Sequence, residues 1–549
     1  MTAQNFDGQN LVGDDFSFLD LNESSFFKTR LEDVLFNNTL LQRTNFGEAV
    51  LINVDASGAD FTDAQLNLAT FQGGDFDGAN FTRANLSFIS TASAPNNVFS
   101  AQNAIFTDAI LTKANLSGEQ SERPNLAGAD FTRADLSEAN LKAADLTGAI
   151  FREANLQLAS LEATLFVNVD ATGADFRLSN FTDVTLSGSI FDLANLNGVA
   201  VTDTTPLNPN DLSSTRFRGA DLMGFRAEDL NLSNSDFSTF VDPITGAETV
   251  TNLANASLAD SNLNGANLNG VIATNAFLED VSLTNGSLVE ANLTDANLAD
   301  ADLSGGNLNG VIATNAFLER INLTNASLVG ADLSGANLNG AFLTGADFMG
   351  VDLSGAILTG VNLSGADLSG AELDGVNLNG ADLSGVNLTG VDLSGAILTG
   401  VNLNGADLSG TNLDGANLSG AILTGAELDN ASLVGINLKE ATGDNLTNFT
   451  GSDLTGASLE VASFIGSNFT NADFFVSGQP TANLNGADLT GATLNNTDLT
   501  QVTFVDGIAT NANLVDALLV DSNLTKANFA GANLTGADLT GAITVDTIF

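Results

Sequence analysis

A leucine or phenylalanine recurs at every fifth position of this 549-residue chain, from Phe6 to Phe549, with three one-residue shifts of phase. A small residue, usually alanine, stands two places before it, and the commonest unit reads Ala-(Asp/Asn)-Leu-(Ser/Thr/Asn)-Gly. Residues five apart lie about 140° apart around an α-helix, so this spacing builds no apolar helix face. In extended backbone, however, the small and the large residue point to the same side. The spacing therefore predicts three-residue strands joined by two-residue corners.

We number each unit from its large residue, position i, so that the small residue is i−2 and the corner residues are i+1 and i+2. Residues 351–370 reappear almost unchanged at 391–410, and residues 267–278 reappear at 307–318. Both offsets equal eight pentapeptides, which permits coils of two, four or eight pentapeptides. We expect coils of four pentapeptides, because four sides leave room for four inward leucines in each layer.

Units such as Ala331-Asp332-Leu333-Ser334-Gly335 fill essentially the whole chain, and in this the sequence resembles the pentapeptide-repeat family. The resemblance implies an all-β fold, a right-handed quadrilateral β-helix (a pentapeptide-repeat solenoid) with four pentapeptides in each coil. At roughly 4.8 Å per coil, about 27 coils would form a rod about 130 Å long.

The phase of the repeat divides the chain into four stretches: 1–201, 202–252, 253–438 and 439–549. The stretch 202–252 carries two irregular loops, and the other three are β-helix. We expect one continuous solenoid in which the irregular segments form loops or bulges at corners. These segments are 87–105, 117–124, 202–216, 238–252, 439–448 and 475–483.

Exceptions at position i test the inward register. Seven in-phase positions carry alanine, and in six of them the residue two places before is large. Ala273, for example, follows Val271. Volume lost at one inward site is restored at the other, as a close-packed core demands. The seven alanines are Ala56, Ala101, Ala171, Ala227, Ala273, Ala313 and Ala509.

Composition limits the chemistry that this chain can carry. It contains no Cys, His, Trp or Tyr, so thiol nucleophiles, histidine bases and Cys/His zinc sites are absent. No other catalytic, metal or cofactor signature stands out from the repeat, so we predict a protein that is not an enzyme and has no cofactor. No apolar run is long enough for a membrane helix, and the start lacks a secretory signal. Cytoplasmic localisation is the default, although an uncleaved C-terminal export signal would leave no trace here.

Charge is strongly negative and unevenly spread. The formal net charge is −50, of which residues 227–549 contribute −34 with only three basic side chains, Arg320, Lys439 and Lys526. This argues against direct binding to nucleic acid or to an anionic membrane. Basic protein surfaces and cations are the natural partners.

With four pentapeptides per coil, the outward i−1 residues of the uninterrupted run fall into four rows, and two neighbouring rows are acidic. One holds Asp332, Asp352, Glu372 and Asp392, and the other holds Asp347, Asp367, Asp407 and Glu427. Carboxylates about 4.8 Å apart should raise one another's pKa or recruit cations. These eight residues are our candidate partner-binding site, and no basic residue lies between Arg320 and Lys439.

Three interpretations of these rows stay open. Asp and Asn at i−1 are either interchangeable residues that support turns and solubility, or a mimic of DNA, or a cation-binding or other acidic surface. About 50 charges over about 130 Å is one per roughly 2.6 Å, against about 1.7 Å in duplex DNA. Some shorter members of the family act as DNA mimics that bind DNA gyrase, although this chain is far longer and lacks an evident C-terminal dimerisation helix.

We therefore predict a non-enzymatic, rod-shaped interaction scaffold with an acidic surface. The alternative is a DNA mimic that inhibits or protects a DNA-binding enzyme such as DNA gyrase. Bare strand edges at both ends would favour a homodimer through terminal coils. The outward residues Ile110, Ile150 and Ile190 recur at intervals of eight pentapeptides, as do Ile272 and Ile312. They could form an apolar stripe, but inheritance from a duplicated unit explains the spacing equally well and is the interpretation we favour. The basic cluster Arg216, Arg218 and Arg226 is expected to balance charge.

Overall fold

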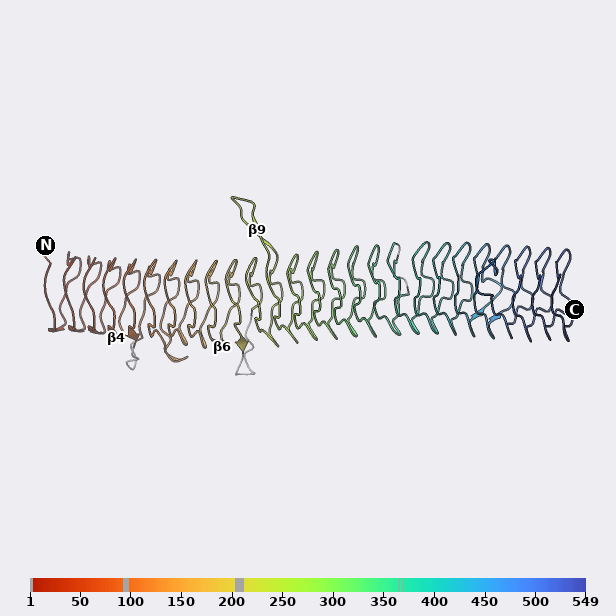
Figure 1. The fold of residues 1–549 in the computed structure, drawn as a ribbon. Coiled ribbons are helices and arrows are strands. Elements are labelled where there is room, and N and C mark those ends of the chain that lie inside the picture. Colours follow the sequence, from red (N-terminus) through yellow and green to blue (C-terminus); the bar gives the residue numbers. More distant parts are fainter. Residues whose placement is uncertain (1–2, 92–97, 203–211, 365, 369) are drawn as a thin grey trace. The chain divides into compact units, whose positions relative to one another are not determined.

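A computed structural model describes residues 3–91, 98–202, 212–364, 366–368 and 370–549. The chain forms two compact units, Met1–Ser287 and Leu288–Phe549, and each is a stack of coils (Figure 1). The described residues form no α-helix. The predicted fold class, a pentapeptide-repeat β-solenoid, is confirmed. The prediction that the four stretches make one continuous solenoid stays a prediction.

Only short segments are extended enough to count as strands. Unit 1 contains a five-stranded parallel sheet, one parallel pair and one antiparallel pair, and unit 2 contains one parallel pair. The strands are β1 (Asn10–Val12), β2 (Arg30–Glu32), β3 (Val50–Ile52), β4 (Thr70–Gln72), β5 (Ser90–Thr91), β6 (Phe181–Thr182), β7 (Val201–Thr202), β8 (Phe240–Val241), β9 (Glu248–Thr249), β10 (Thr442–Gly443) and β11 (Ser463–Phe464). Within each unit, most of the other i−1 residues form single parallel bridges with the i−1 residues of successive coils.

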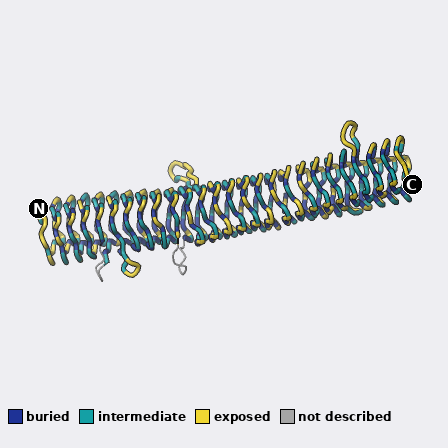
Figure 2. Tube along the Cα trace, turned by 60° about the horizontal axis from the view of Figure 1, so that its bottom comes forward, coloured by how far each residue is buried: buried dark blue, intermediate teal, exposed yellow. Residues whose placement is uncertain are grey.

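The pairing register confirms coils of four pentapeptides. Leu11 pairs with Leu31 and Leu31 with Leu51 in unit 1, and Asp332 pairs with Asp352 in unit 2. A coil therefore has four faces, one for each pentapeptide. Away from the ends of the chain, positions i−2 and i are buried, whereas most residues at i−1, i+1 and i+2 are half-buried or exposed (Figure 2).

Each pentapeptide satisfies its own backbone N–H groups in a fixed way, as residues 332–336 show. The amide of Asp332 donates to the preceding coil, to the carbonyl of Val311 at 2.8 Å. The amides of Leu333 and Gly335 donate to the following coil at 2.8 and 2.9 Å. The next amide closes the corner by donating back to the carbonyl of Leu333 at 3.0 Å. Only the amide of i+1 lacks a backbone acceptor in this scheme, and it must find a side chain.

The compensated alanine positions pack as predicted. Val271 and Ala273 are both buried, as are Val311 and Ala313, and so are the other four compensated pairs. In unit 1 the core is built largely from phenylalanine rings that stack from coil to coil. Phe81, Phe106 and Phe131 lie nearly parallel, with ring centroids 4.9 and 4.7 Å apart.

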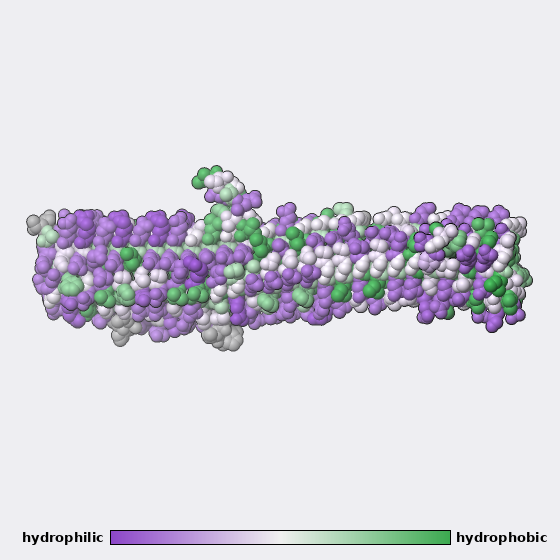
Figure 3. All heavy atoms as spheres, viewed as in Figure 1, coloured by the Kyte–Doolittle hydropathy of each residue, from purple (hydrophilic) through white to green (hydrophobic). Residues whose placement is uncertain are grey.

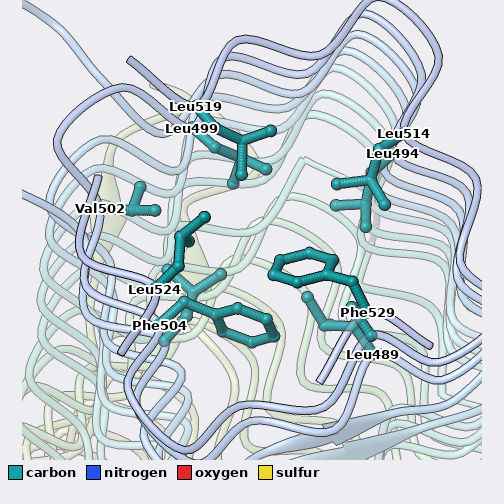
Figure 4. Close-up of a pocket in the computed structure, with 11 residues that line it drawn as sticks. Leu489, Leu494, Leu499, Val502, Phe504, Leu514, Leu519, Leu524 and Phe529 are labelled. Carbon is teal, nitrogen blue, oxygen red and sulfur yellow. The ribbon is translucent and has the colours of Figure 1, made fainter. Parts of the chain in front are cut away.

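Ala509 is the one uncompensated exception, because the residue two places before it is Gly507. The ring of Phe504 lies in the space that a larger residue 507 would fill, since a Cβ there would come within 2.2 Å of that ring. A small apolar cavity of about 10 Å³ remains beside Ala509, between Leu489 and Phe529 (Figure 4). It is lined only by core side chains.

The three phase shifts are local insertions, as predicted. Across them Ile190 pairs with Arg216, Asp221 with Asn252 and Glu427 with Asn448, so each of these coils has one residue more than a whole number of pentapeptides. The second insertion is the antiparallel hairpin β8–β9, which projects from unit 1 (Figure 1). The third adds a single residue to its coil next to β10, where a bulge was expected.

The other three irregular segments each add a whole pentapeptide, so the phase does not change. Their coils hold five pentapeptides, because Asp75 pairs with Ser100, Asn115 with Asn140 and Ser458 with Asn483. The prediction of 87–105 as irregular was too wide, because β5 pairs with β4 and the repeat is regular again from Ser100. The part of this segment at 92–97 lies outside the described residues, as does 203–211 in the segment 202–216.

These insertions also rule out an apolar stripe through Ile110, Ile150 and Ile190, which was one of the two interpretations of their spacing. Ile110 pairs with Asp135 and belongs to a different row from Ile150 and Ile190. The residue that shares their row is Ile105, because the extra pentapeptide at 117–124 shifts the row by one side of the coil. Asp130 and Asp170 alternate with the isoleucines in that row, so an equal spacing in sequence did not measure position along one face.

Candidate partner-binding surface

The two acidic rows exist as predicted. Asp332, Asp352, Glu372 and Asp392 pair in succession, and we call them the first acidic row. Asp347 pairs with Asp367, and Asp407 with Glu427, in the second acidic row. Asp347 and Asp352 are consecutive i−1 positions, so the two rows lie on neighbouring faces. Four of the eight side chains are exposed and four are half-buried; the exposed ones are Asp367, Glu372, Asp392 and Glu427.

The aspartates of these rows have a structural task, because they accept the i+1 amide that the backbone leaves over. The amide of Ser354, for example, donates to Oδ1 of Asp352 at 2.8 Å. Asp347, Asp392 and Asp407 accept in the same way. Among the described residues, no hydrogen bond reaches Oδ2 of Asp347, Asp352 or Asp392. Each of these side chains therefore closes a turn with one oxygen and leaves the other toward solvent.

Where i−1 is serine or threonine, a second arrangement replaces the first. The i+1 residue of the preceding coil then accepts the amide: Val434 donates to Oδ1 of Asp414 at 2.9 Å. The hydroxyl of Ser432 donates to the same oxygen at 2.7 Å. Sequence reasoning missed this arrangement, although its signal is Ser or Thr at i−1 together with Asp or Asn at i+1 of the same side one coil earlier.

The ionisation of the rows differs from the expectation. Burial acts to raise the pKa of Asp332, but hydrogen bonds from Ser334 and Thr314 outweigh it, and the pKa lies below its usual value. The hydroxyl and amide of Ser409 likewise lower the pKa of Asp407. The prediction that stacked carboxylates raise one another's pKa is therefore wrong at these two sites, because hydrogen bonds to the charged form dominate.

Mutual repulsion does contribute at one place outside the candidate site. Asp473 pairs with Asp453 on one side and with Asp498 on the other. Burial raises the pKa of Asp473, and the charges of these two neighbours add to the rise. Three aspartates in immediate succession thus have the effect that we had expected of the acidic rows.

The other two faces of the same coils are almost neutral. One row alternates asparagine and isoleucine, at Asn337, Ile357, Asn377, Ile397 and Asn417. The next holds Phe342, Asn362, Asp382, Asn402 and Ile422. In this part of unit 2, acidic faces and neutral faces therefore lie on opposite sides of the coil.

The corners beside the acidic rows carry no side chain. Every described i+2 residue from Gly330 to Gly425 is glycine with a positive φ. At Gly330, Gly350 and Gly390, which lie on the corner between the two acidic rows, nothing approaches within 4 Å of the position that a Cβ would occupy. On the face of the molecule that Figure 3 shows, purple hydrophilic residues cover much of the surface, with smaller patches of pale and green residues between them. Both acidic rows are therefore open to a partner along this shared corner.

The i+2 corner positions of unit 1 often hold residues other than glycine. Although glycine occupies some of its corners, others carry charged side chains in the left-handed conformation, and several of these pair with the corner one coil away. Arg83 binds Asp63 at 2.7 Å and Arg133 binds Asp108 at 2.7 Å. Three more such pairs are Lys28–Glu48, Arg43–Glu23 and Lys113–Glu138. Most basic side chains of unit 1 are thus paired with carboxylates, although residues 1–287 hold 37 acidic and only 13 basic side chains.

The basic cluster of the sequence has the charge-balancing role that was expected, with a partner that the sequence did not reveal. Asp192 is 1% exposed and binds Arg216 at 2.8 Å and Arg218 at 2.7 Å. Arg226 pairs with Glu228 instead. The Arg218 guanidinium also lies 5.6 Å from the ring of Phe240, at the base of the β8–β9 hairpin. Asp192 was missed because the length of the insertion hides which coil follows it.

No group of three or more carboxylates in the described ranges is arranged to hold a metal ion. A helix long and apolar enough to cross a membrane is likewise absent from those ranges.

A family model for pentapeptide repeats (8 copies) matches most of the chain. The matched stretches are 29–67, 64–88, 125–162, 159–198, 251–288, 278–312, 291–328, 307–340, 326–365, 362–400, 402–439, 445–475, 482–507 and 509–543. The chain belongs to the pentapeptide-repeat family. The assignment to this family rests on the repeat itself, since no curated protein matches the sequence.

Solved structures of other pentapeptide-repeat proteins are similar to parts of the chain. HetL from the cyanobacterium Nostoc sp. strain PCC 7120, a protein involved in heterocyst differentiation regulation, is 28% identical, and the match covers 50% of this chain and 90% of HetL with a TM-score of 0.15. Rfr23 from the cyanobacterium Cyanothece 51142 is 27% identical over 29% of this chain and 89% of its own, with a TM-score of 0.12. QnrB1, a plasmid-mediated fluoroquinolone resistance protein, is 21% identical over 41% and 86%, with a TM-score of 0.20.

Proposed function

We propose that this pentapeptide-repeat protein is a non-enzymatic interaction scaffold whose two acidic rows bind a basic surface of a partner protein. The observation that supports this proposal is the charge of residues 321–438. Residues 321–438 hold twelve acidic side chains and no basic one, whereas most basic side chains of unit 1 are already paired with carboxylates. Charge that is not neutralised within the protein is available to a partner.

The local geometry supports this use of the rows. Because Oδ1 of each paired aspartate closes a turn, the side chain is held in place before a partner arrives. Preorganised carboxylates lose less conformational freedom on binding than free side chains do. Guanidinium groups suit such a surface, since Arg donates two parallel hydrogen bonds to a carboxylate. The glycine corner between the rows lets a partner approach both.

A DNA-binding enzyme is the second candidate partner, and charge spacing favours it. Residues 321–438 span about six coils, or roughly 28 Å, so their twelve charges amount to one per roughly 2.4 Å. Duplex DNA carries one charge per about 1.7 Å. A protein that binds DNA through a basic groove would therefore meet a comparable density of charge on this surface.

Calorimetric titration with a synthetic arginine-rich peptide tests the first proposal. We expect binding that weakens steeply with salt, because exposed charges are screened within about 8 Å at physiological ionic strength. A supercoiling assay with DNA gyrase, run in parallel, tests the second. Binding without inhibition supports the scaffold, and inhibition relieved by added duplex DNA supports mimicry. Absence of binding to the peptide even at low salt would contradict both.

A further inference from the structure

Asn-Gly pairs are the chemically least stable dipeptides of a folded chain, because the glycine amide nitrogen can attack the asparagine side chain without steric hindrance. This sequence contains nine of them. Their asparagines are Asn197, Asn264, Asn269, Asn285, Asn309, Asn339, Asn379, Asn404 and Asn485. Seven of these sit at i+1 in the regular coils that follow residue 252, so their local backbone is nearly the same. Differences in their environment then decide which of them react.

In one set the next coil holds the asparagine side chain. Oδ1 of Asn309 accepts from the hydroxyl of Ser327 at 2.7 Å and from the amide of Val329 at 2.9 Å. Asn264 accepts from Ser282 and from Thr284 in the same manner. Asn269 accepts from the hydroxyl of Ser287 at 2.6 Å, and Asn485 accepts from the amide of Val505 at 2.8 Å. In all four the next coil has serine or threonine at i−1.

In the other set the next coil offers no hydroxyl. Asn339, Asn379 and Asn404 precede coils whose i−1 residues are Ile357, Ile397 and Ile422. No side-chain hydrogen bond holds any of the three within the described residues, and all three are exposed, whereas the four held asparagines are half-buried. Asn197 and Asn285 belong to neither set, since Asn197 precedes a coil with Asp221 at i−1 and Asn285 is itself a corner residue.

The attacking nitrogen differs within the second set. The amide of Gly380 donates to the carbonyl of Thr399 at 2.8 Å, and that of Gly405 donates to Thr424 at 2.8 Å. The amide of Gly340 lies 3.5 Å from the carbonyl of Thr359. A hydrogen bond of that length is weak. The hydrogen bond that Gly340 must break before its nitrogen can attack the asparagine side chain is therefore the weakest of the three.

We propose that Asn339, Asn379 and Asn404 are sites of spontaneous deamidation, with Asn339 the fastest. The glycine nitrogen forms a bond to Cγ of the asparagine, its proton is lost to solvent, and the side-chain nitrogen leaves as ammonia. Water then opens the cyclic imide at either carbonyl and yields aspartate or isoaspartate. The four asparagines held by the next coil are protected, because their side chains must first break these hydrogen bonds before Cγ can turn toward the glycine nitrogen.

The reaction changes the surface where it occurs. Asn339 and Asn379 lie at i+1 beside the asparagine–isoleucine row, and Asn404 lies beside the other neutral row. Each event adds one negative charge to a face that has almost none. Isoaspartate also adds one backbone atom to the corner, and this extra atom disturbs the regular five-residue geometry of the coil.

Peptide mapping by mass spectrometry tests the proposal on the intact protein, incubated at mildly alkaline pH in water labelled with a heavy oxygen isotope. Label should enter at residue 339 first and at 379 and 404 next. We expect residues 264 and 309 to react about fivefold to tenfold more slowly than 339, the factor that a net hydrogen bond gives. Protein unfolded in urea is the control, in which these Asn-Gly pairs should react at similar rates.

Two reciprocal variants separate the hydrogen bond from other features of each site. Ile357→Ser should slow residue 339 and leave 379 unchanged, because the new hydroxyl can hold Asn339 as Ser327 holds Asn309. Ser327→Ile should speed residue 309 and leave 264 unchanged. Equal rates at 309 and 339 in the folded protein, or no response to either substitution, would overturn the proposal.

Discussion

The corners of unit 1 and those of residues 330–425 in unit 2 solve the same backbone problem in opposite ways. In unit 1 the left-handed i+2 position holds side chains such as Arg83 and Asp63, which accept backbone strain and pair with the next coil. In residues 330–425 it holds glycine, which adopts this conformation without strain but contributes no charge pair. Acidic residues on the strands are therefore left without basic partners in the second region. The same fold thus produces a surface with charge pairs at many of its corners in one region and an acidic surface without basic side chains in the other.

Removing a buried partner in unit 1 should have the largest effect. Asp192→Ala leaves Arg216 and Arg218 without their buried carboxylate, and we expect a loss of about 3 kcal/mol in local stability. Asp352→Ala in unit 2 removes only a turn acceptor and should cost about 1 kcal/mol. Hydrogen exchange of the surrounding amides measures both, since a long repeat array does not unfold in one step. Equal costs would remove the contrast between the two regions.

Core volume gives the next largest effect, and its sign depends on the residue two places before. Ala273→Leu should overpack a layer that Val271 already fills and cost about 1–3 kcal/mol. Ala509→Val should instead stabilise its layer by up to about 1 kcal/mol, because it fills the cavity beside Phe504. Thermal unfolding of the two variants, each against the parent, measures the difference. Stabilisation by Ala273→Leu would contradict the packing account.

A glycine corner should be more sensitive than a charged one. Gly390→Ala places a Cβ at positive φ and should cost about 1 kcal/mol, although nothing crowds the new atom. Gly390→Asn should cost less, because asparagine tolerates the left-handed conformation. Arg83→Ala in unit 1 breaks only an exposed ion pair, so it should change stability least of the three. Hydrogen exchange at these corners ranks the three changes, and the reverse order would contradict the strain argument.

The smallest effect concerns the aspartate whose pKa is raised. Because the folded-state pKa of Asp473 is above its unfolded value, the charged form destabilises the fold at neutral pH, and this cost disappears as the pH falls through that pKa. Asp473→Asn should therefore stabilise the protein at pH 7 by a few tenths of a kcal/mol, given its solvent exposure. The gain should vanish below about pH 4. Asp332→Asn should do the opposite, since its lowered pKa makes the charged form stabilising above that pH.

The period of five was sufficient to predict the inward register, because that depends only on spacing. The two acidic rows also needed four pentapeptides per coil, which the spacing allowed and the family resemblance implied. The period was not sufficient where the number of inserted residues matters. Ile110 was assigned to the wrong row because 117–124 adds a whole pentapeptide without changing the phase. Asp192 was missed because an insertion separates it from Arg216. The pKa of Asp332 was misjudged because the turn hydrogen bond from Ser334 is stronger than repulsion between neighbours, and spacing alone does not reveal that bond.

Binding of the arginine-rich peptide to two variants of equal charge tests the central claim most directly. Asp332, Asp352, Asp367 and Asp407 are changed together to Asn in one variant, and Asp55, Asp75, Asp130 and Asp145 of unit 1 in the other. Asn can accept the same turn amides, so both variants should stay folded, with a net charge of −46 in place of −50. If the acidic rows are the binding surface, affinity at low salt falls markedly in the first variant and little in the second. If both lose affinity equally, or neither does, the rows only solubilise the protein and the account of its function is wrong.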